Sequence, residues 1–97
     1  MEIYKMLTIS ANHIKRKTWR MLQEDQIEAV ATYKKEYNGD LYGFFIVASD
    51  CEVDEVAEVA PDLAECIEFA KMHDCAWLCI DEDGEVTPRL PSYKWYD

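Results

Sequence analysis

The sequence predicts an α+β fold in which short strands alternate with two helices over 97 residues. Two apolar runs of strand length, residues 41–48 and 76–80, indicate buried strands. Residues 11–23 instead repeat apolar side chains every three to four positions, as an amphipathic helix does. A chain of this length, with 49% apolar residues and no internal repeat or linker, predicts a single domain over residues 1–97.

The N-terminal part is expected to form a strand followed by a helix. Residues 4–9, YKMLTI, are short and β-rich, and Ser10 after them is a suitable N-cap for the helix over residues 11–23. The outer face of this helix is basic and lies beside Trp19; its basic residues are Lys15, Arg16, Lys17 and Arg20. This face is either an anion or partner site or an ordinary solvated helix surface.

The middle of the chain predicts a β-hairpin. Residues 27–37 are rich in Val, Thr and Tyr, and the Asn38-Gly39 pair that follows is the strongest short hairpin signal, because both residues tolerate positive φ. The returning strand, residues 41–48, is apolar on both faces. Gly43 within it indicates a bulge or a close packing contact.

The second half is expected to begin with an acidic segment and a helix. Residues 50–60 are interpreted as a loop or a weak helical turn. Pro61 then introduces a helix over residues 62–73, in which Asp62 and Glu65 have the spacing of a capping arrangement.

A strand over residues 76–80 and a short strand over residues 85–87 complete the order β-α-β-β-α-β, with a C-terminal hairpin and tail. This is the split βαβ order of ferredoxin-like folds, a single sheet with two helices on one face. A different α+β sheet, with the hairpin of residues 27–48 at one edge, is the competing arrangement.

The second face of this sheet is expected to be covered. Residues 44–47 and 77–80 are consecutive apolar residues, whereas a sheet with one solvated face alternates apolar and polar residues. The cover is either the aromatic tail, with Tyr93, Trp95 and Tyr96, or a second copy of the chain in a homodimer through the open sheet face.

Negative charge is concentrated in the second half of the chain. Residues 1–48 carry seven Lys/Arg and six Asp/Glu, a balance of +1, whereas residues 49–97 carry three and fourteen, a balance of −11, which gives the net charge of −10. Such a surface repels phosphate backbones and anionic lipid headgroups. We therefore expect no direct nucleic-acid binding by that half and no membrane binding.

The cysteines and the first residues indicate a cytoplasmic protein. No stretch approaches the roughly 20 apolar residues that span a bilayer, and no basic and apolar signal-peptide regions are visible. Without an export signal, the four cysteines are expected to be reduced thiols rather than disulfides; they are Cys51, Cys66, Cys75 and Cys79.

No residue pattern amounts to a recognised metal or cofactor site. His73, Cys75 and Cys79 lack the spacing of a zinc site, and the acidic turn that begins at Asp81 lacks the spacing of a calcium loop. We therefore expect no metal and no cofactor.

A catalytic role would require a thiol or hydroxyl beside a base. The chain offers two histidines and four cysteines for such a pair, but no nucleophile elbow. The alternative to a non-catalytic protein is a small-ligand-binding protein or a thiol-dependent enzyme, with a pocket near His13, Trp77 and Cys79.

Several strings along the chain resemble the uncharacterised domain-of-unknown-function family 5983. They are LTISANHI from Leu7, PDLAECIEFA from Pro61, CAWLCID from Cys75 and LPSYKW from Leu90. The Cys-x-Trp-Leu-Cys string followed by Asp-x-Asp-Gly-Glu is the most specific part, and residues 24–58 match least distinctly. The resemblance implies small accessory proteins of anaerobic, mostly Gram-positive bacteria, frequently encoded in mobile elements near anti-restriction genes, and it supplies no catalytic residues.

We expect a non-catalytic protein-interaction module, with the accessory or anti-defence role that the resemblance implies. Its contact face is expected to be acidic and to comprise Glu52, Asp54, Glu55, Glu58, Asp62, Glu65 and Glu68. The alternative for this acidic run is an ordinary solvated surface. The expected partner is a basic or DNA-binding protein, because opposite charges across an interface favour association.

Overall fold

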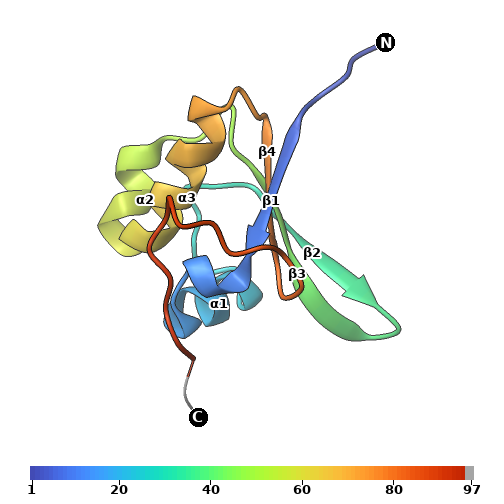
Figure 1. The fold of residues 1–97 in the computed structure, drawn as a ribbon, viewed down its shortest axis with the longest axis vertical. Coiled ribbons are helices and arrows are strands. Elements are labelled where there is room, and N and C mark those ends of the chain that lie inside the picture. Colours follow the sequence, from blue (N-terminus) through green and yellow to red (C-terminus); the bar gives the residue numbers. More distant parts are fainter. Residues whose placement is uncertain (96–97) are drawn as a thin grey trace.

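The computed structural model describes residues 1–95 of the chain. It contains a mixed four-stranded sheet with three α-helices on one face (Figure 1). The strands are β1 (Met6–Ser10), β2 (Thr32–Tyr37), β3 (Asp40–Val47) and β4 (Trp77–Asp81). The helices are α1 (Arg16–Gln23), α2 (Val53–Val59) and α3 (Pro61–Met72), and a short 3-10 helix, η1 (Ala11–His13), precedes α1. The expected α+β class is confirmed.

The strand order is β1-β4-β3-β2, in which β1 and β4 are parallel and the other neighbours are antiparallel. The ferredoxin-like order is not confirmed, because a split βαβ unit keeps a strand between its two parallel strands, whereas β1 and β4 are adjacent. β4 is an inner strand, and its consecutive apolar residues Leu78, Cys79 and Ile80 are almost fully buried there. The hairpin of β2 and β3 ends the sheet on the other side, as in the competing arrangement.

The helix expected over residues 11–23 is divided into η1 and α1. The Ser10 hydroxyl accepts from the Asn12 N–H at 3.0 Å, so Ser10 caps η1 as predicted. Ile14 and Lys15 then return to extended backbone, and α1 begins at Arg16. The break has a physical cause: the Asp62 carboxylate of α3 accepts from the Lys15 N–H at 2.7 Å and so fixes the start of α1.

The predicted hairpin is present, with a shorter first strand. Asn38 and Gly39 both have positive φ, 52° and 83°, as a tight hairpin turn requires. β2 begins only at Thr32, because Ile27 and Val30 before it are buried side chains of an irregular segment. The expected β3 is confirmed.

The acidic segment over residues 50–60 is more regular than expected, because it contains the helix α2. Val56 and Ala60 are buried, so this helix has an apolar side that packs inward. Pro61 follows at the first position of α3, where a missing N–H costs nothing. Asp62 does not cap α3, since the N-cap is Ala60 and has no side-chain bond.

Residues 85–87 do not form the expected short strand. Within residues 1–95, this segment is joined to β1 by one backbone bond, from the Ser10 N–H to the Glu85 carbonyl at 3.0 Å. The segment instead leads the chain back across the helical side of the molecule, where residues 88–95 lie (Figure 1).

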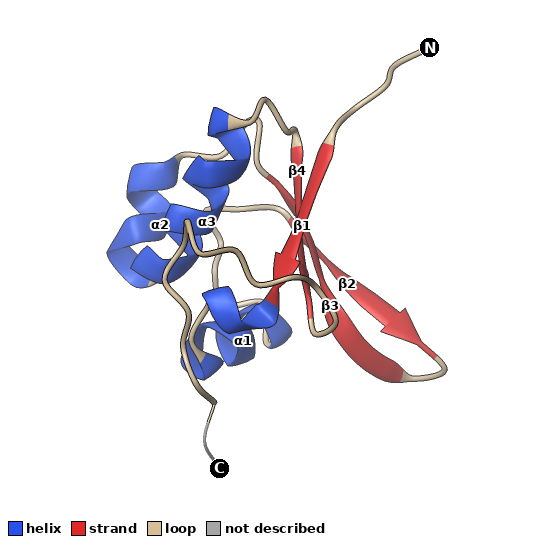
Figure 2. Ribbon diagram, viewed as in Figure 1, coloured by secondary structure: helices blue, strands red, loops and turns tan. Residues whose placement is uncertain are grey.

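The core lies between the sheet and the helices (Figure 2). Side chains alternate along each strand, so Phe44, Ile46, Leu78 and Ile80 point toward the helices and are fully buried. Trp19 of α1 packs its ring against Phe44 with centroids 4.8 Å apart. Of the described residues 1–95, none forms a helix on the opposite face of the sheet.

Candidate functional site

Six of the seven predicted contact residues are exposed on the helix pair α2 and α3. They are Glu52, directly before α2, then Asp54, Glu55 and Glu58 on α2, and Glu65 and Glu68 on α3. The two helices pack against each other on the same side of the sheet (Figure 1). We call these six residues the acidic helix face.

Positive charge is scarce beside the acidic helix face. Lys71 is the one Lys or Arg in residues 50–85, and its ammonium donates to the Cys51 carbonyl at 3.2 Å. Within residues 1–95, none of the six carboxylates forms an ion pair. They are therefore available to cations from outside the chain.

Asp62, the seventh predicted contact residue, is buried and has an internal role. Its side chain is only 5% exposed, and its carboxylate accepts from the Lys15 N–H and the Thr18 hydroxyl, each at 2.7 Å. Asp62 therefore does not lie on the exposed acidic surface where the sequence analysis placed it. A carboxylate at this place joins α3 to the first turn of α1, where the helix dipole favours negative charge.

His13 is buried, and both of its ring nitrogens are occupied. Nε2 accepts from the Thr87 N–H at 2.9 Å, and Nδ1 lies 2.8 Å from the Pro91 carbonyl. Because a carbonyl can only accept, the proton is on Nδ1. His13 thus holds the C-terminal segment in place and has no nitrogen left to act as a general base.

The predicted pocket of His13, Trp77 and Cys79 does not form. His13 lies on the helical side of the sheet, where its carbonyl accepts from the Cys66 thiol at 3.5 Å. Leu78 and Ile80 of β4 face the same side, so Trp77 and Cys79 face the opposite one. The sheet therefore separates the histidine from the other two residues.

The four thiols are free and buried. Burial, together with the negative charges of Asp62 and Glu65, raises the pKa of Cys66 to about 12. Burial also raises the pKa values of Cys51 and Cys79. A thiol with a raised pKa is a poor nucleophile at neutral pH. Within residues 1–95, no three His, Cys, Asp or Glu side chains are placed to hold a metal ion.

The aromatic tail packs on the helical side and not on the second face of the sheet. The Tyr93 N–H donates to the Asn12 carbonyl at 2.7 Å, and the Trp95 indole donates to the Ile14 carbonyl at 2.9 Å. The Trp95 ring also packs edge-on against the Trp19 ring, with the ring centroids 5.4 Å apart. The prediction that the tail covers the second face is wrong for these residues, and Tyr96 lies outside the described residues.

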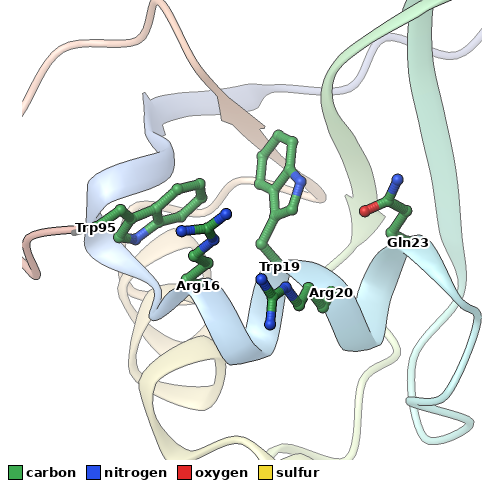
Figure 3. A pocket seen from close by; sticks show the side chains of 5 residues that line it. All are labelled: Arg16, Trp19, Arg20, Gln23 and Trp95. Carbon is green, nitrogen blue, oxygen red and sulfur yellow. The ribbon is translucent and has the colours of Figure 1, made fainter. Parts of the chain in front are cut away.

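The predicted basic face of α1 borders a hollow of about 300 Å³. Figure 3 shows Arg16, Arg20 and Gln23 projecting from α1, with Trp19 between them and Trp95 approaching from the tail. Guanidinium groups beside aromatic rings can bind planar anions. The sequence identified the arginines and Trp19 but not Trp95, because nothing local indicates that the tail returns to α1.

The uncovered face of the sheet exposes aromatic side chains. Met6, Tyr33, Phe45 and Trp77 surround a shallow apolar hollow of about 290 Å³. Tyr33 is 58% exposed, and its ring lies 6.0 Å from that of Trp77. We call this surface the open face.

The family is now evident from comparison as well as from resemblance. Residues 6–95 match the model described as "Family of unknown function (DUF5983) C-terminal domain", and the chain belongs to this family. Comparisons with curated proteins and with solved structures gave no match. Within residues 1–95, every helix is too short or too polar to cross a bilayer.

Proposed function

We propose that the protein is a non-catalytic interaction module that binds a basic, DNA-binding protein through the acidic helix face. One observation carries the proposal: within residues 1–95, the six carboxylates of the acidic helix face are exposed and form no ion pair, whereas Asp62 is turned inward and accepts two hydrogen bonds. Asp62 thus has a structural role inside the fold, whereas the carboxylates of the acidic helix face are exposed and can contact a partner.

The chemistry of this face fits a partner that also binds nucleic acid. Lys and Arg side chains that neutralise phosphates also pair with carboxylates, and a complementary face speeds encounter as well as setting orientation. An accessory protein of a mobile element could act against host defence by occupying the DNA-contacting surface of a defence protein. The family resemblance supports this setting.

A thiol-dependent reaction is disfavoured by the same structure. His13 uses both nitrogens to hold the tail, and burial raises the pKa of the Cys66 thiol to about 12. Four free, buried cysteines also support our placing of the protein in the cytoplasm, where thiols stay reduced.

The test compares two variants of equal charge. In the first, the six residues of the acidic helix face are changed to Gln or Asn. In the second, six exposed acids elsewhere are changed in the same way: Glu24, Glu28, Glu36, Glu82, Asp83 and Glu85. Both variants gain six charge units, so only the position of the change differs.

Affinity capture from the native host should identify a basic protein, whose binding is then measured with purified components. We expect the first variant to lose binding and the second to retain it. Raising the salt from about 50 to 200 mM should weaken wild-type binding, because the Debye length falls from roughly 14 to about 7 Å. Equal binding by the two variants, or a partner without basic surface, would refute the proposal.

A further inference from the structure

The edge strand β1 directs half of its peptide groups away from the sheet. The Lys5 carbonyl accepts from the N–H groups of Ala76 and Trp77, which places the odd-numbered peptide groups of this strand toward β4. The even-numbered groups therefore point outward. The Ser10 N–H agrees with this alternation, since it donates to the Glu85 carbonyl outside the sheet.

Two residues of β1 keep unused groups on that outer edge. Within residues 1–95, the outward N–H and C=O groups of Met6 and Thr8 have no backbone partner. Both residues are exposed. An edge strand with free peptide groups is a template for a further strand.

A groove of about 560 Å³ runs beside this edge. Lys5 and β1 form one side of it. Phe69 of α3, the residues that follow this helix, His73 and Cys75, and residues 85–89 form the rest. Its apolar lining comes from Leu7, Ile9, Phe69 and Val86. A strand added to β1 would therefore find a place for apolar side chains on the side that faces the helices.

The other edge of the sheet is protected against such pairing. β2 exposes Lys34 and Glu36 and has a register shift between Lys35 and Glu36. Charged side chains and bulges are the usual means by which edge strands avoid other chains. β1, with the sequence MLTIS, has neither.

The residues before β1 are a suitable strand for this edge. Residues 1–4, which we call the N-terminal arm, leave β1 away from the body of the molecule (Figure 1). Ile3 is 87% exposed and Tyr4 60% exposed, so these apolar side chains find little cover within residues 1–95. The arm continues directly from Lys5, which is bonded to β4.

We propose that two copies of the chain pair through antiparallel β1 edges, with the N-terminal arm of each lying along the β1 edge of the other. Tyr4 would lie opposite Met6 of the second copy, and Glu2 opposite Thr8. This register uses the free outward groups of Met6 and Thr8 and stops short of Ser10, whose N–H is already bonded.

The same register places the side chains appropriately. Residues directly opposite in an antiparallel pair share a face. Ile3 therefore lies opposite Leu7 on the groove side, and Tyr4 lies beside Met6 on the open face. The sheet becomes continuous across the two copies, and the acidic helix face of each is left uncovered, so this association is independent of the proposed function.

The β1 edge avoids contact between the acidic surfaces of two copies of a chain with net charge −10. The register sets Lys5 opposite Lys5 of the second copy, but each ammonium donates to the His73 carbonyl of its own copy at 3.0 Å, which holds it away from the two-fold axis. β1 itself has no charged residue, and Arg89 and a single acid, Glu85, also border the groove. Contact through α2 or α3 would instead bring like charges together.

Sedimentation equilibrium over concentrations from about 1 to 500 µM measures the association, since weak dimers dissociate in this range. The arm variant is Ile3→Asp, and its matched control is Tyr37→Asp, an exposed apolar site on β2. The edge variant is Thr8→Pro, which removes an outward N–H, and its control is Lys34→Pro on the other edge.

We expect a reversible wild-type dimer that Ile3→Asp and Thr8→Pro each weaken by roughly tenfold or more, as loss of a central contact does. Both controls should dimerise like wild type. Because Ile3 is exposed, Ile3→Asp tests the proposal even if Thr8→Pro unfolds. A wild-type monomer at every concentration would overturn it. A dimer that Ile3→Asp leaves intact and that Trp77→Ser disrupts would also overturn it, by showing that the open faces meet instead.

Discussion

The two faces of the sheet are made by the same strands but have different environments. On the covered face, Phe44, Ile46 and Leu78 are fully buried beneath the helices. On the open face, Phe45 and Trp77 are only partly buried, although they are neighbours of these residues in sequence. A strand with consecutive apolar residues therefore need not be covered on both faces of the sheet by other parts of the same chain. It also separates residues that determine stability from residues available for contact.

The adjacent pair Phe44 and Phe45 gives the largest contrast between the faces. Phe44→Ala should lower the free energy of unfolding by about 3–5 kcal/mol, because it leaves a cavity beneath Trp19. Phe45→Ala should lower it by about 1 kcal/mol or less, as partly exposed sites do. Urea denaturation measures both. Equal losses would mean that something also covers the open face.

Gly43 lies where the backbones of β3 and β4 leave no room for a side chain. A Cβ at this position would lie 2.1 Å from the Ile80 carbonyl oxygen, and that oxygen belongs to the backbone and cannot turn aside. Gly43→Ala should therefore cost about 1–3 kcal/mol. Gly39→Ala is a useful comparison because its Cβ would meet no atom within 4 Å, so its cost should come only from the positive φ. If Gly43→Ala cost less than Gly39→Ala in thermal unfolding, the two strands would have to separate more easily than we infer.

His13 tests how strongly the helical side holds the C-terminal segment. His13→Ala removes two hydrogen bonds and leaves the Thr87 N–H and the Pro91 carbonyl without their partner. The free energy of unfolding should fall by about 1–3 kcal/mol. The exposed His73 is the control, and His73→Ala should change it by no more than about 0.5 kcal/mol. Chemical denaturation, monitored by tryptophan fluorescence, measures the free energy of unfolding of both variants. Similar losses in the two variants would contradict the anchoring role of His13.

The smallest effect is expected from the ion pair between Lys35 and Asp81 on the open face. The hydrogen bond from Lys35 lowers the pKa of Asp81 in the folded protein. The ion pair therefore stabilises the fold at pH values above the unfolded-state pKa of about 4. This contribution is lost as the pH falls through the lower pKa of the folded state. Lys35→Met should cost about 1 kcal/mol or less at pH 7, and the difference from wild type should shrink below pH 4. Urea midpoints at several pH values measure this. A difference that grew in acid would exclude the ion pair as its source.

Local signals in the sequence predicted much of the secondary structure. The Asn38-Gly39 turn, β3 and α3 lie where turn chemistry and apolar periodicity place them. α2 was missed because acidic residues dominate its composition, although Val53, Val56 and Ala60 have helical spacing. That spacing was the signal available.

Non-local pairing was not predictable in the same way. No local pattern shows that β1 pairs with β4, and this pairing decides the strand order. The role of Asp62 was not predictable for the same reason, because its hydrogen-bond partners Lys15 and Thr18 are distant in the sequence. Six of the seven acids predicted to contact a partner are exposed, whereas the predicted pocket does not form because alternation along β4 turns Trp77 away from His13.

The parallel contact between β1 and β4 has a consequence for how the protein is made. Met6 pairs with Trp77, so most of the chain must leave the ribosome before the first strand finds its neighbour. The β2–β3 hairpin needs only local contacts and can form much earlier. We therefore expect the nascent N-terminal strand to wait unpaired during synthesis, a period in which its outer edge is most vulnerable to pairing with the wrong chain.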